Sequence, residues 1–452
     1  MDPRRRETLE TTTLSLPFHD VTLAGVCQEG CYPDKKAHVN QDRFLCEPRF
    51  GGDDRQLLLG VFDGHGSNGE HCASIAAATF PRELERLRDD PALASHGDRD
   101  AAVPHRAWSA DEALHSYSRA FVETNARVMK DLGDGAKSSG TTAVVAHVVG
   151  DMLHMANVGD SRAILGVEDL EGSRGRGSNR WDVVEVTHDQ TCFRADERTR
   201  MRRDAAEPVM FATLGMILGE TAMSEQFGEE SIESADDPPR VFRDGASYPG
   251  CAFTRSLGDA VGKNLGVCEM PELLTYQLDA SVRCLVLASD GVFEFMTNEE
   301  VMGVARLRAG DPARAAREIA ETAYAHWAAE DSRSDDVTCV VAYFTPKEGV
   351  SAAPANADLG LAGSEGAKEN WKKLRDVLRA GAVKNRPALR FANAVLAKAA
   401  IDLRRRRGSL AMEELFPDFD WANVAELKRT ASLRGGLKKL SVDEDGEAAN
   451  NE

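Results

Sequence analysis

Several features that would define a class of protein are missing from this chain. Its nine cysteines are an odd number, and none of them forms a Cys-x-x-Cys pair. A disulfide framework and a structural zinc site both need paired cysteines, so we expect neither, and the pattern is typical of a reducing compartment. Cys27 and Cys31 lie close in sequence, but no second pair accompanies them, so we interpret them as ordinary thiols.

Long apolar runs are absent as well. The first residues, Met-Asp-Pro-Arg-Arg-Arg, lack the apolar stretch of a secretory signal peptide, and no run of 18 apolar residues occurs. Position 2 is Asp2 rather than the glycine that N-myristoylation requires. These absences predict a soluble intracellular protein, cytoplasmic, nuclear or both, with no transmembrane segment.

Positive charge is scarce in most of the chain. The 452 residues carry a formal net charge of −19, so we expect no nucleic-acid partner. Residues 351–452 hold 18 Lys and Arg against 15 Asp and Glu, a net charge of +3, which leaves 1–350 at −22. An acidic body of this kind fits a cation site better than a site that attracts anions.

Strand-like and helix-like runs follow one another along the chain. Strands are predicted at 21–26, 57–62, 141–149, 153–157, a short run ending at 167, 283–288 and 337–344. Helices are predicted at 70–88, 111–132, 298–307 and 312–329. Strand runs, helix runs and hairpin signals together predict an α+β protein with stacked sheets.

The boundaries follow changes in composition. We expect a flexible N-terminus at 1–17, a folded domain at 18–346, a linker at 347–367 and a basic tail at 368–452. Residues 190–250 are charged and irregular, and a segment of that length inside a domain is usually functional or mobile.

Acidic residues stand beside several of the predicted strands. Asp63 follows an apolar run and begins Asp-Gly-His-Gly, Asp290 follows another run, Asp335 precedes the last strand, and Asp160 lies in Gly-Asp-Ser-Arg. One Asp-Gly is usually only a turn, but here the arrangement recurs. Carboxylates that converge at one end of a sheet need cations between them, and oxygen ligands favour Mg²⁺ or Mn²⁺. Two such ions can share and ionise a bridging water that attacks a phosphoryl group, and His65 could protonate the leaving oxygen.

Seven motifs occur in the order seen in metal-dependent type 2C Ser/Thr protein phosphatases, which the region 20–345 resembles. The motifs are Asn40-Gln41-Asp42, Asp63-Gly64-His65-Gly66, Ser139-Gly140-Thr141-Thr142-Ala143, Ala156-Asn157-Val158-Gly159-Asp160-Ser161-Arg162, Thr254-Arg255-Ser256-Leu257-Gly258-Asp259, Ala288-Ser289-Asp290-Gly291 and Asp335-Asp336-Val337-Thr338. The resemblance implies a β-sandwich of two antiparallel sheets flanked by helices, with a metal site at one edge. It also makes 18–346 a phosphatase catalytic domain and 190–250 a flap that influences substrate choice.

The resemblance implies roles for individual residues. The expected metal-site residues are Asp63 (bridging two ions), Gly64 (through its carbonyl), Asp290 and Asp335 (first ion), Asp160 (a weaker third ion) and Asp42 (behind the ligands). His65 is the expected general acid. Asp259 is expected to act indirectly, by orienting the segment after the flap.

Two positions depart from the pattern of many members of the family. Gln41 stands where many members have Glu, which replaces one carboxylate by an amide. Many members also have an Arg a few residues earlier that grips the substrate phosphate, and Lys36 is the expected substitute here. Lysine neutralises a phosphate but lacks the bidentate geometry of arginine, so weaker substrate binding is expected. Several further motifs are similar to the phosphatase module that plants and algae fuse to cyclic-nucleotide-binding and kinase domains.

The tail has its own pattern. Residues 368–407 contain 13 Lys and Arg against 3 acidic residues. Such a run is most often a solvated basic arm. However, Ser409 follows four arginines, and Ser432 lies in a similar basic context, so both resemble sites of basophilic, cyclic-nucleotide-dependent kinases. We hypothesise that a phosphate at Ser409 loosens the contact between the tail and the acidic body. A pseudosubstrate segment is the alternative for the tail.

The sequence therefore predicts a monomeric, metal-dependent protein serine/threonine phosphatase acting on phosphoprotein substrates. The alternative for the whole chain is an inactive phosphatase-fold binding module, because the phosphate-gripping arginine is missing.

Overall fold

The computed structural model describes residues 6–32, 38–88, 110–168, 181–224, 227, 237–330 and 333–350. The chain divides into two units, Met1–Glu365 and Gly366–Glu452, and every described residue belongs to the first. Several predicted features lie outside the described residues, namely Lys36, most of the 347–367 linker, the 368–452 tail and its serines Ser409 and Ser432. Of the described helices, none is both long and apolar enough to cross a membrane.

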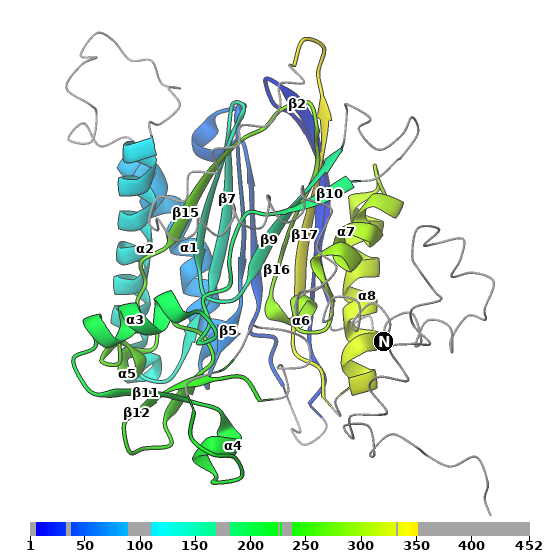
Figure 1. Ribbon diagram of the computed structural model, residues 1–452. Coiled ribbons are helices and arrows are strands. Elements are labelled where there is room, and N and C mark those ends of the chain that lie inside the picture. The colour runs from blue at the N-terminus through cyan, green and yellow to red at the C-terminus, as the bar shows by residue number, and fades with distance from the viewer. Residues whose placement is uncertain are drawn as a thin grey trace, which may run out of the picture. The chain divides into compact units, whose positions relative to one another are not determined.

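Two antiparallel sheets face each other in the first unit (Figure 1). The six-stranded sheet has the order β1 (Arg6–Ser15), β2 (His19–Gln28), β17 (Val337–Pro346), β16 (Val282–Ala288), β9 (Arg162–Glu168) and β10 (Trp181–Glu185). The five-stranded sheet has the order β15 (Glu272–Gln277), β8 (Met152–Val158), β7 (Ala143–Val149), β4 (Gln56–Phe62) and β3 (Arg43–Pro48). The predicted α+β class with stacked antiparallel sheets is confirmed.

Both faces of the central strands are buried, which explains their continuous apolar sequence. Along β4, Leu57, Leu59 and Val61 point into the core between the two sheets. The alternate residues, Leu58 and Phe62, point into a second core beneath the helices. This division follows from the two-residue period of a strand, and each such side chain stabilises the fold by about 1.5–3 kcal/mol.

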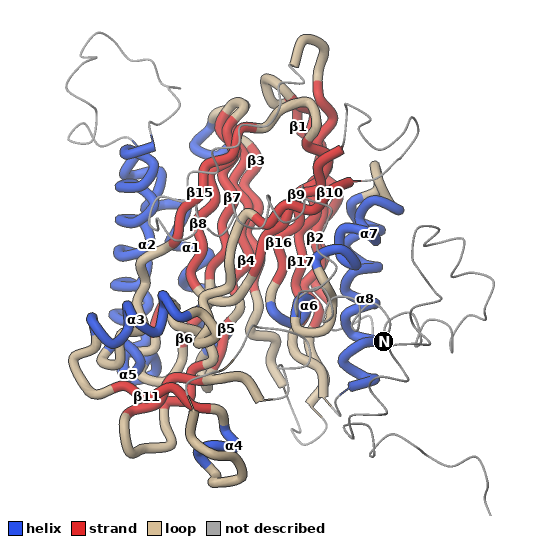
Figure 2. Tube along the Cα trace, viewed as in Figure 1, coloured by secondary structure: helices blue, strands red, loops and turns tan. Residues whose placement is uncertain are grey.

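Helices cover the outer face of each sheet (Figure 2). The long helices α1 (Gly69–Arg88) and α2 (Ala110–Leu132) bury their apolar faces on the five-stranded sheet. The six-stranded sheet is covered by α6 (Asp290–Phe293), α7 (Asn298–Leu307) and α8 (Pro312–Glu330). The four predicted helices are found within one residue of their expected ends.

The N-terminus corrects one prediction. Residues 1–17 were expected to be flexible, yet Arg6–Ser15 forms β1 and pairs with β2 in the antiparallel direction. Most of its side chains are exposed because β1 is an edge strand, and only Leu9 and Leu14 pack against the core. The strand is therefore held mainly by backbone hydrogen bonds to β2. Because such bonds do not require apolar side chains, the sequence shows only a weak apolar pattern here.

Residues 190–250 correct a second prediction, since their described part is ordered rather than irregular. It contains α3 (Ala195–Asp204), β11 (Val209–Ala212), α4 (Leu214–Ile217), β12 (Arg240–Arg243) and β13 (Pro249–Cys251), and the three strands form a sheet. A small core that includes Met201, Phe211 and Val241 lies beneath α3. Strands of three or four residues are too short to show a clear period, so the pattern escaped detection.

A further three-stranded sheet connects distant parts of the chain. Its order is β14 (Leu257–Gly258), β6 (Gly140–Thr141) and β5 (Gly64–His65). His65 pairs with Gly140, and Gly140 pairs on its other side with Gly258. This sheet places the Asp-Gly-His-Gly turn beside the segment that leaves residues 190–250, and α5 (Ala260–Lys263) follows directly.

One buried histidine makes the stability of this fold depend on pH. His154 lies on β8, its Nδ1 is 3.0 Å from Thr275 Oγ1, and its Nε2 has no hydrogen-bond partner among the described residues. Burial lowers the pKa of His154 to about 4. The unfolded chain therefore binds more protons between about pH 6.5 and 4, so stability is complete above this range and falls as the pH drops through it.

We predict that the free energy of unfolding of the wild type falls by about 2 kcal/mol through this group between pH 7 and pH 5. The variant His154→Gln should lack that component, which urea titrations at both pH values would measure. The control is His71→Gln, because the His71 side chain is 62% exposed. Parallel pH dependences of the wild type and His154→Gln would contradict the prediction.

Candidate active site

The acidic residues singled out in the sequence lie at one edge of the sandwich because of strand direction. Strand β16 runs antiparallel to β17 and β9, and Ala288 at its end pairs with Cys339 and Arg162 near their starts. The residues just after β16 and just before β17 and β9 therefore share one edge, which brings together Asp290, Asp335 and Asp160.

The fourth acid reaches this edge from the other sheet. Asp63 directly follows β4, and its backbone N–H donates to Thr142 Oγ1 at 3.1 Å. The Thr142 N–H donates in return to the Asp63 carbonyl at 2.8 Å. The Thr142 hydroxyl also lies 2.7 Å from the Ser161 hydroxyl, next to the start of β9. Thr142 thus fixes the end of β4 against the edge of the six-stranded sheet.

Four carboxylates interact at this edge, those of the buried Asp42 and of the partly buried Asp63, Asp290 and Asp335. Burial, followed by repulsion from Asp290 and Asp42, raises the pKa of Asp63 well above its usual value. Burial and the charge of Asp335 raise the pKa of Asp290 to about 6. Burial likewise raises the pKa of Asp335 and of Asp42, with Asp336 adding to both. Each carboxylate is therefore costly to ionise in the presence of the others.

The chemistry of this cluster fits a hard cation. Asp290 Oδ1 is buried and lacks a hydrogen-bond partner within the part of the chain that the structure describes. A buried carboxylate oxygen without a partner is unfavourable, and a divalent cation would satisfy it and reverse the repulsion among its neighbours. The neighbouring donors are carboxylate oxygens, as Mg²⁺ and Mn²⁺ prefer.

Gly64 lies where no side chain could fit. It is buried beside Asp63, and a Cβ atom there would collide with the carbonyl oxygens of Gly69 and Gln41. A bulkier residue would displace the turn that carries Asp63 and His65.

Asp336 organises the loop that borders the cluster. One of its carboxylate oxygens accepts from the Gly30 N–H at 2.7 Å and lies 2.8 Å from His38 Nε2, and the other accepts from the Gln41 N–H at 2.8 Å. Next to it, the Tyr32 hydroxyl donates to Asp335 at 2.5 Å. The sequence analysis assigned no role to Asp336 or Tyr32. Neighbouring side chains on a strand point in opposite directions, so the alternation could have indicated that Asp336 has a role different from that of Asp335.

Asp42 and Gln41 each contact a residue near the ligands that the sequence predicts. Asp42 is 1% exposed and accepts from the Ser289 hydroxyl at 2.8 Å, next to Asp290. The Gln41 amide donates to the Gly66 carbonyl at 2.8 Å and to Glu70 at 3.1 Å. The amide thus links the start of α1 to the Asp-Gly-His-Gly turn.

His65 is held by the carboxylate of Asp259, for which the sequence predicted only an indirect role. Its Nε2 lies 2.7 Å from Asp259 Oδ2, and the Ser256 hydroxyl donates to the same oxygen at 2.6 Å. Phe253 lies over the imidazole, with ring centroids 4.3 Å apart. Asp259 was expected only to orient the segment after the flap, but it contacts His65 directly. The small β5–β6–β14 sheet creates this contact, and its two-residue strands are invisible in the sequence.

Asp160 lies at the same edge, in the turn between β8 and β9. The neighbouring Gly159 N–H donates to Gln190 Oε1 at 2.7 Å, and the Gln190 amide donates to the Asn157 carbonyl at 3.0 Å. Gln190 therefore anchors the turn before β9 to the start of the 190–250 segment.

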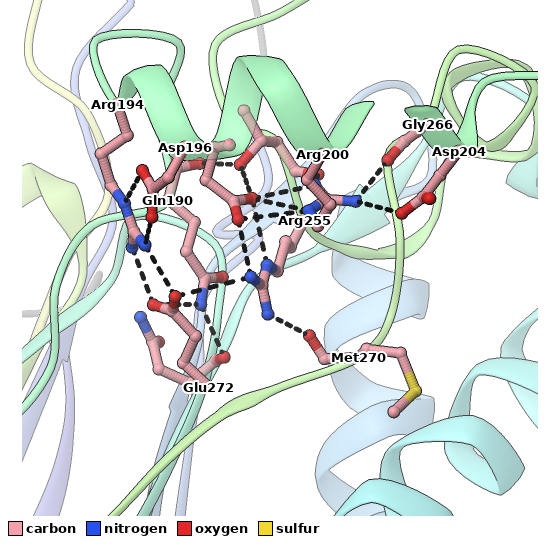
Figure 3. Close-up of polar contacts among 12 residues, drawn as sticks. Gln190, Arg194, Asp196, Arg200, Asp204, Arg255, Gly266, Met270 and Glu272 are labelled. Carbon is pink, nitrogen blue, oxygen red and sulfur yellow. Dashed lines mark hydrogen bonds and ion pairs between the residues drawn. The ribbon is translucent and has the colours of Figure 1, made fainter. Parts of the chain in front are cut away.

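A second acidic group shows what an internally neutralised cluster looks like (Figure 3). Oxygens of Asp196, Glu197 and Glu272 lie within 4.8 Å of one another. Arg194 pairs with Asp196 and Glu272, each at 2.7 Å, and Arg255 pairs with Glu197 at 2.6 Å. Because arginines occupy the space between these acids, the group ties α3 to β15 and does not need a cation.

Glu197 lies at the centre of this ion network. It is 2% exposed, and its carboxylate accepts from Arg255, from Arg200 at 2.8 Å and from the Thr254 hydroxyl at 2.6 Å. Burial by itself raises the pKa of Glu197, but the hydrogen bonds from Arg255 and Arg200 outweigh it and hold the pKa well below its usual range.

We predict that Glu197→Gln lowers the free energy of unfolding by about 3–5 kcal/mol, because it leaves buried arginines without their counter-charge. Urea denaturation would measure the loss. The matched control is Glu123→Gln, which breaks the exposed pair with Arg119 and should cost less than about 0.5 kcal/mol. Equal losses in the two variants would contradict this account of the network.

Comparisons with known proteins place the whole catalytic region in one family. The family described as "Protein phosphatase 2C" matches residues 33–332. Probable protein phosphatase 2C 35 of Arabidopsis thaliana is 31% identical over 325 residues, 72% of this chain and 84% of that protein. Probable protein phosphatase 2C 72 of the same plant is 30% identical over 313 residues, 69% and 83% of the two chains. The crystal structure of a serine-threonine phosphatase 2C from Toxoplasma gondii has a similar fold, with a TM-score of 0.54, 17% identity, and coverage of 75% of this chain and 99% of that one.

Proposed function

The chain belongs to the protein phosphatase 2C family and is a serine/threonine protein phosphatase, and we propose that its chemistry takes place at the carboxylate cluster around Asp63 and Asp290. The observation that carries this proposal is the set of mutually repelling carboxylates, in which the buried Oδ1 of Asp290 has no hydrogen-bond partner among the described residues. Such a cluster is unfavourable by itself and becomes favourable when divalent cations bind.

The family is metal-dependent in general, and we assign the ligands here to the acidic edge. Asp63, Asp290, Asp335 and the Gly64 carbonyl would hold two Mg²⁺ or Mn²⁺ ions, Asp160 would help to hold a weaker third, and Asp42 would orient the ligands from behind. When bound, the ions supply an activated water nucleophile and neutralise charge on the phosphoryl group. The protein fixes the positions of the carboxylates through Thr142, Ser289 and the loop around Asp336.

His65 is the proposed general acid. It lies two residues after Asp63, on the short strand β5. From there it could give a proton to the serine or threonine oxygen as the phosphorus–oxygen bond breaks. Lys36 is proposed to bind the substrate phosphate, and the proposed substrates are phosphoproteins.

We predict that Asp290→Asn lowers kcat by at least about a hundredfold toward p-nitrophenyl phosphate and a phosphothreonine peptide, because lost metal electrostatics are worth several kcal/mol. Assays with Mn²⁺, with Mg²⁺ and with EDTA would show the metal dependence. The control is Asp134→Asn, whose side chain is 91% exposed.

A second readout is independent of turnover. Mn²⁺ at a hundredfold excess over its Kd should stabilise the wild type by about 2.7 kcal/mol, and this stabilisation should be much weaker in Asp290→Asn. A folded wild type that is stabilised by metal but inactive on both substrates would favour the alternative function, a binding module without catalysis.

The tail is proposed to regulate the catalytic unit through charge. Phosphate at Ser409 or Ser432 would reduce the positive charge of the tail and so weaken its attraction to residues 1–350, whose net charge is −22. A basophilic, cyclic-nucleotide-dependent kinase is the proposed partner, and a pseudosubstrate role for the same segment is the alternative.

We predict that Ser409→Asp raises activity relative to Ser409→Ala by about two- to fivefold at low salt, and that the difference shrinks at high salt, where screening weakens the contact. Limited proteolysis of the tail should be faster in Ser409→Asp. Identical activity and identical proteolysis of the two variants would refute this regulatory role, and loss of function on deletion of 351–452 would favour the kinase-directed alternative.

A further inference from the structure

Asp259 adopts a backbone conformation that is unfavourable for its residue type. It has φ 50° and ψ 52°, in the left-handed region, where non-glycine residues are uncommon and Asn and Asp are tolerated best. Among the described residues, the only other non-glycine with positive φ is Arg49. Strain of this kind persists where the surroundings impose it, and it often marks a functional position.

The side chain of Asp259 also forgoes the bond that its position offers. Asp259 is the residue before α5, where an aspartate normally accepts from the backbone N–H groups of the first turn. Here its side chain makes no such capping bond. Instead, Oδ2 lies 2.7 Å from His65 Nε2 and accepts from the Ser256 hydroxyl at 2.6 Å. The carboxylate is therefore directed at the imidazole and not at its own helix.

The surroundings leave little freedom to this pair. The Asp259 side chain is 5% exposed, whereas that of His65 is 25% exposed. Gly140 lies against the carboxylate, and a Cβ there would collide with Asp259 Oδ2. Phe253 covers the imidazole. The Nε2 end of the His65 ring thus lies against the buried Asp259 carboxylate, while part of the side chain remains exposed.

The segment that carries these contacts is anchored by the ion network of Figure 3. Phe253 and Ser256 contact His65 and Asp259, and the two residues between them bind Glu197. The Thr254 hydroxyl donates to Glu197 at 2.6 Å, and Arg255 pairs with it at 2.6 Å. Glu197, through Thr254 and Arg255, therefore holds in place the neighbouring residues Phe253 and Ser256.

We propose that Asp259 is a positioning residue for His65, which holds the imidazole through Nε2 and leaves Nδ1 as the nitrogen that serves the substrate. This inference rests on the proposed function of His65 as general acid. In the step, the phosphorus–oxygen bond to serine or threonine breaks as the water oxygen bonds to phosphorus. The Nδ1 proton moves to the leaving oxygen, while Asp259 keeps its hydrogen bond from Nε2–H and takes up no proton.

The test compares leaving groups in the full chain. Asp259→Asn should keep the fold, because asparagine tolerates the left-handed conformation and nearly matches aspartate in shape. We expect it to lower kcat about 10- to 100-fold toward a phosphothreonine peptide, whose aliphatic leaving group needs a proton. Toward p-nitrophenyl phosphate, whose leaving group is stable as an anion, the loss should be less than about threefold, with KM changed less than about twofold.

The double variant with His65→Ala shows whether Asp259 acts through His65. In the His65→Ala background, Asp259→Asn should lower kcat by less than about twofold further, because residues that act as a unit are not additive. Additive losses, or equal losses toward both substrates, would overturn the proposal.

A measurement without turnover separates this inference from the proposed function. Ring ¹⁵N-labelled histidine NMR should show a hydrogen-bonded Nε2–H of His65, assigned by its loss in His65→Ala, that shifts in Asp259→Asn and not in Asp134→Asn. A His65 ring signal unchanged by Asp259→Asn would overturn the positioning role. A wild type that is inactive on both substrates would instead refute the proposed function, while the NMR comparison would still decide the contact.

Discussion

The close approach of like charges at one edge of the sandwich is the constraint on which the site depends. Asp63, Asp290 and Asp335 come from three different strand ends, and the charges of Asp290 and Asp335 add to burial in raising the pKa of Asp63. A carboxylate charge that is removed from water without a counter-charge costs several kcal/mol of folding free energy. If these carboxylates were on flexible loops, the loops could move apart and avoid that cost. Here each acid adjoins a strand with two buried faces, and every one of the seven residues of β4 is buried. The two cores therefore hold the carboxylates where repulsion alone would separate them.

Two acidic clusters in this molecule differ in how their charge is neutralised. That difference distinguishes a cluster with a structural role from a cluster that could bind a cation. Around Glu197, arginine hydrogen bonds overcome burial and hold the carboxyl pKa low. Around Asp63, burial and neighbouring carboxylates both act in the opposite direction and raise the pKa. Tight spacing alone would favour the first cluster, because its oxygens lie within 4.8 Å of one another. Charge balance, rather than distance, identifies the cluster that has room for a cation.

The fold was predictable where periodicity is strong. Residues 57–62, 283–288 and 298–307 have buried faces long enough to show their period, and α7 also begins with the capping box of Thr297 and Glu300. β1 and the short strands between 209 and 251 were missed because backbone pairing or a small local core holds them. In the site, strand ends indicated Asp63 and Asp290, but the contact between Asp259 and His65 spans 194 residues and could not be predicted from local pattern.

The departure at Gln41 is explained by its neighbours. The backbone N–H of Gln41 donates to Asp336, a contact that any residue except proline could make, so the loop keeps its course whatever the side chain. The side-chain amide donates to Glu70 and to the Gly66 carbonyl. A glutamate at position 41 would have no proton to donate and would face Glu70 as a like charge. The amide therefore matches Glu70, and the acidic edge avoids one further negative charge beside four carboxylates that already oppose one another.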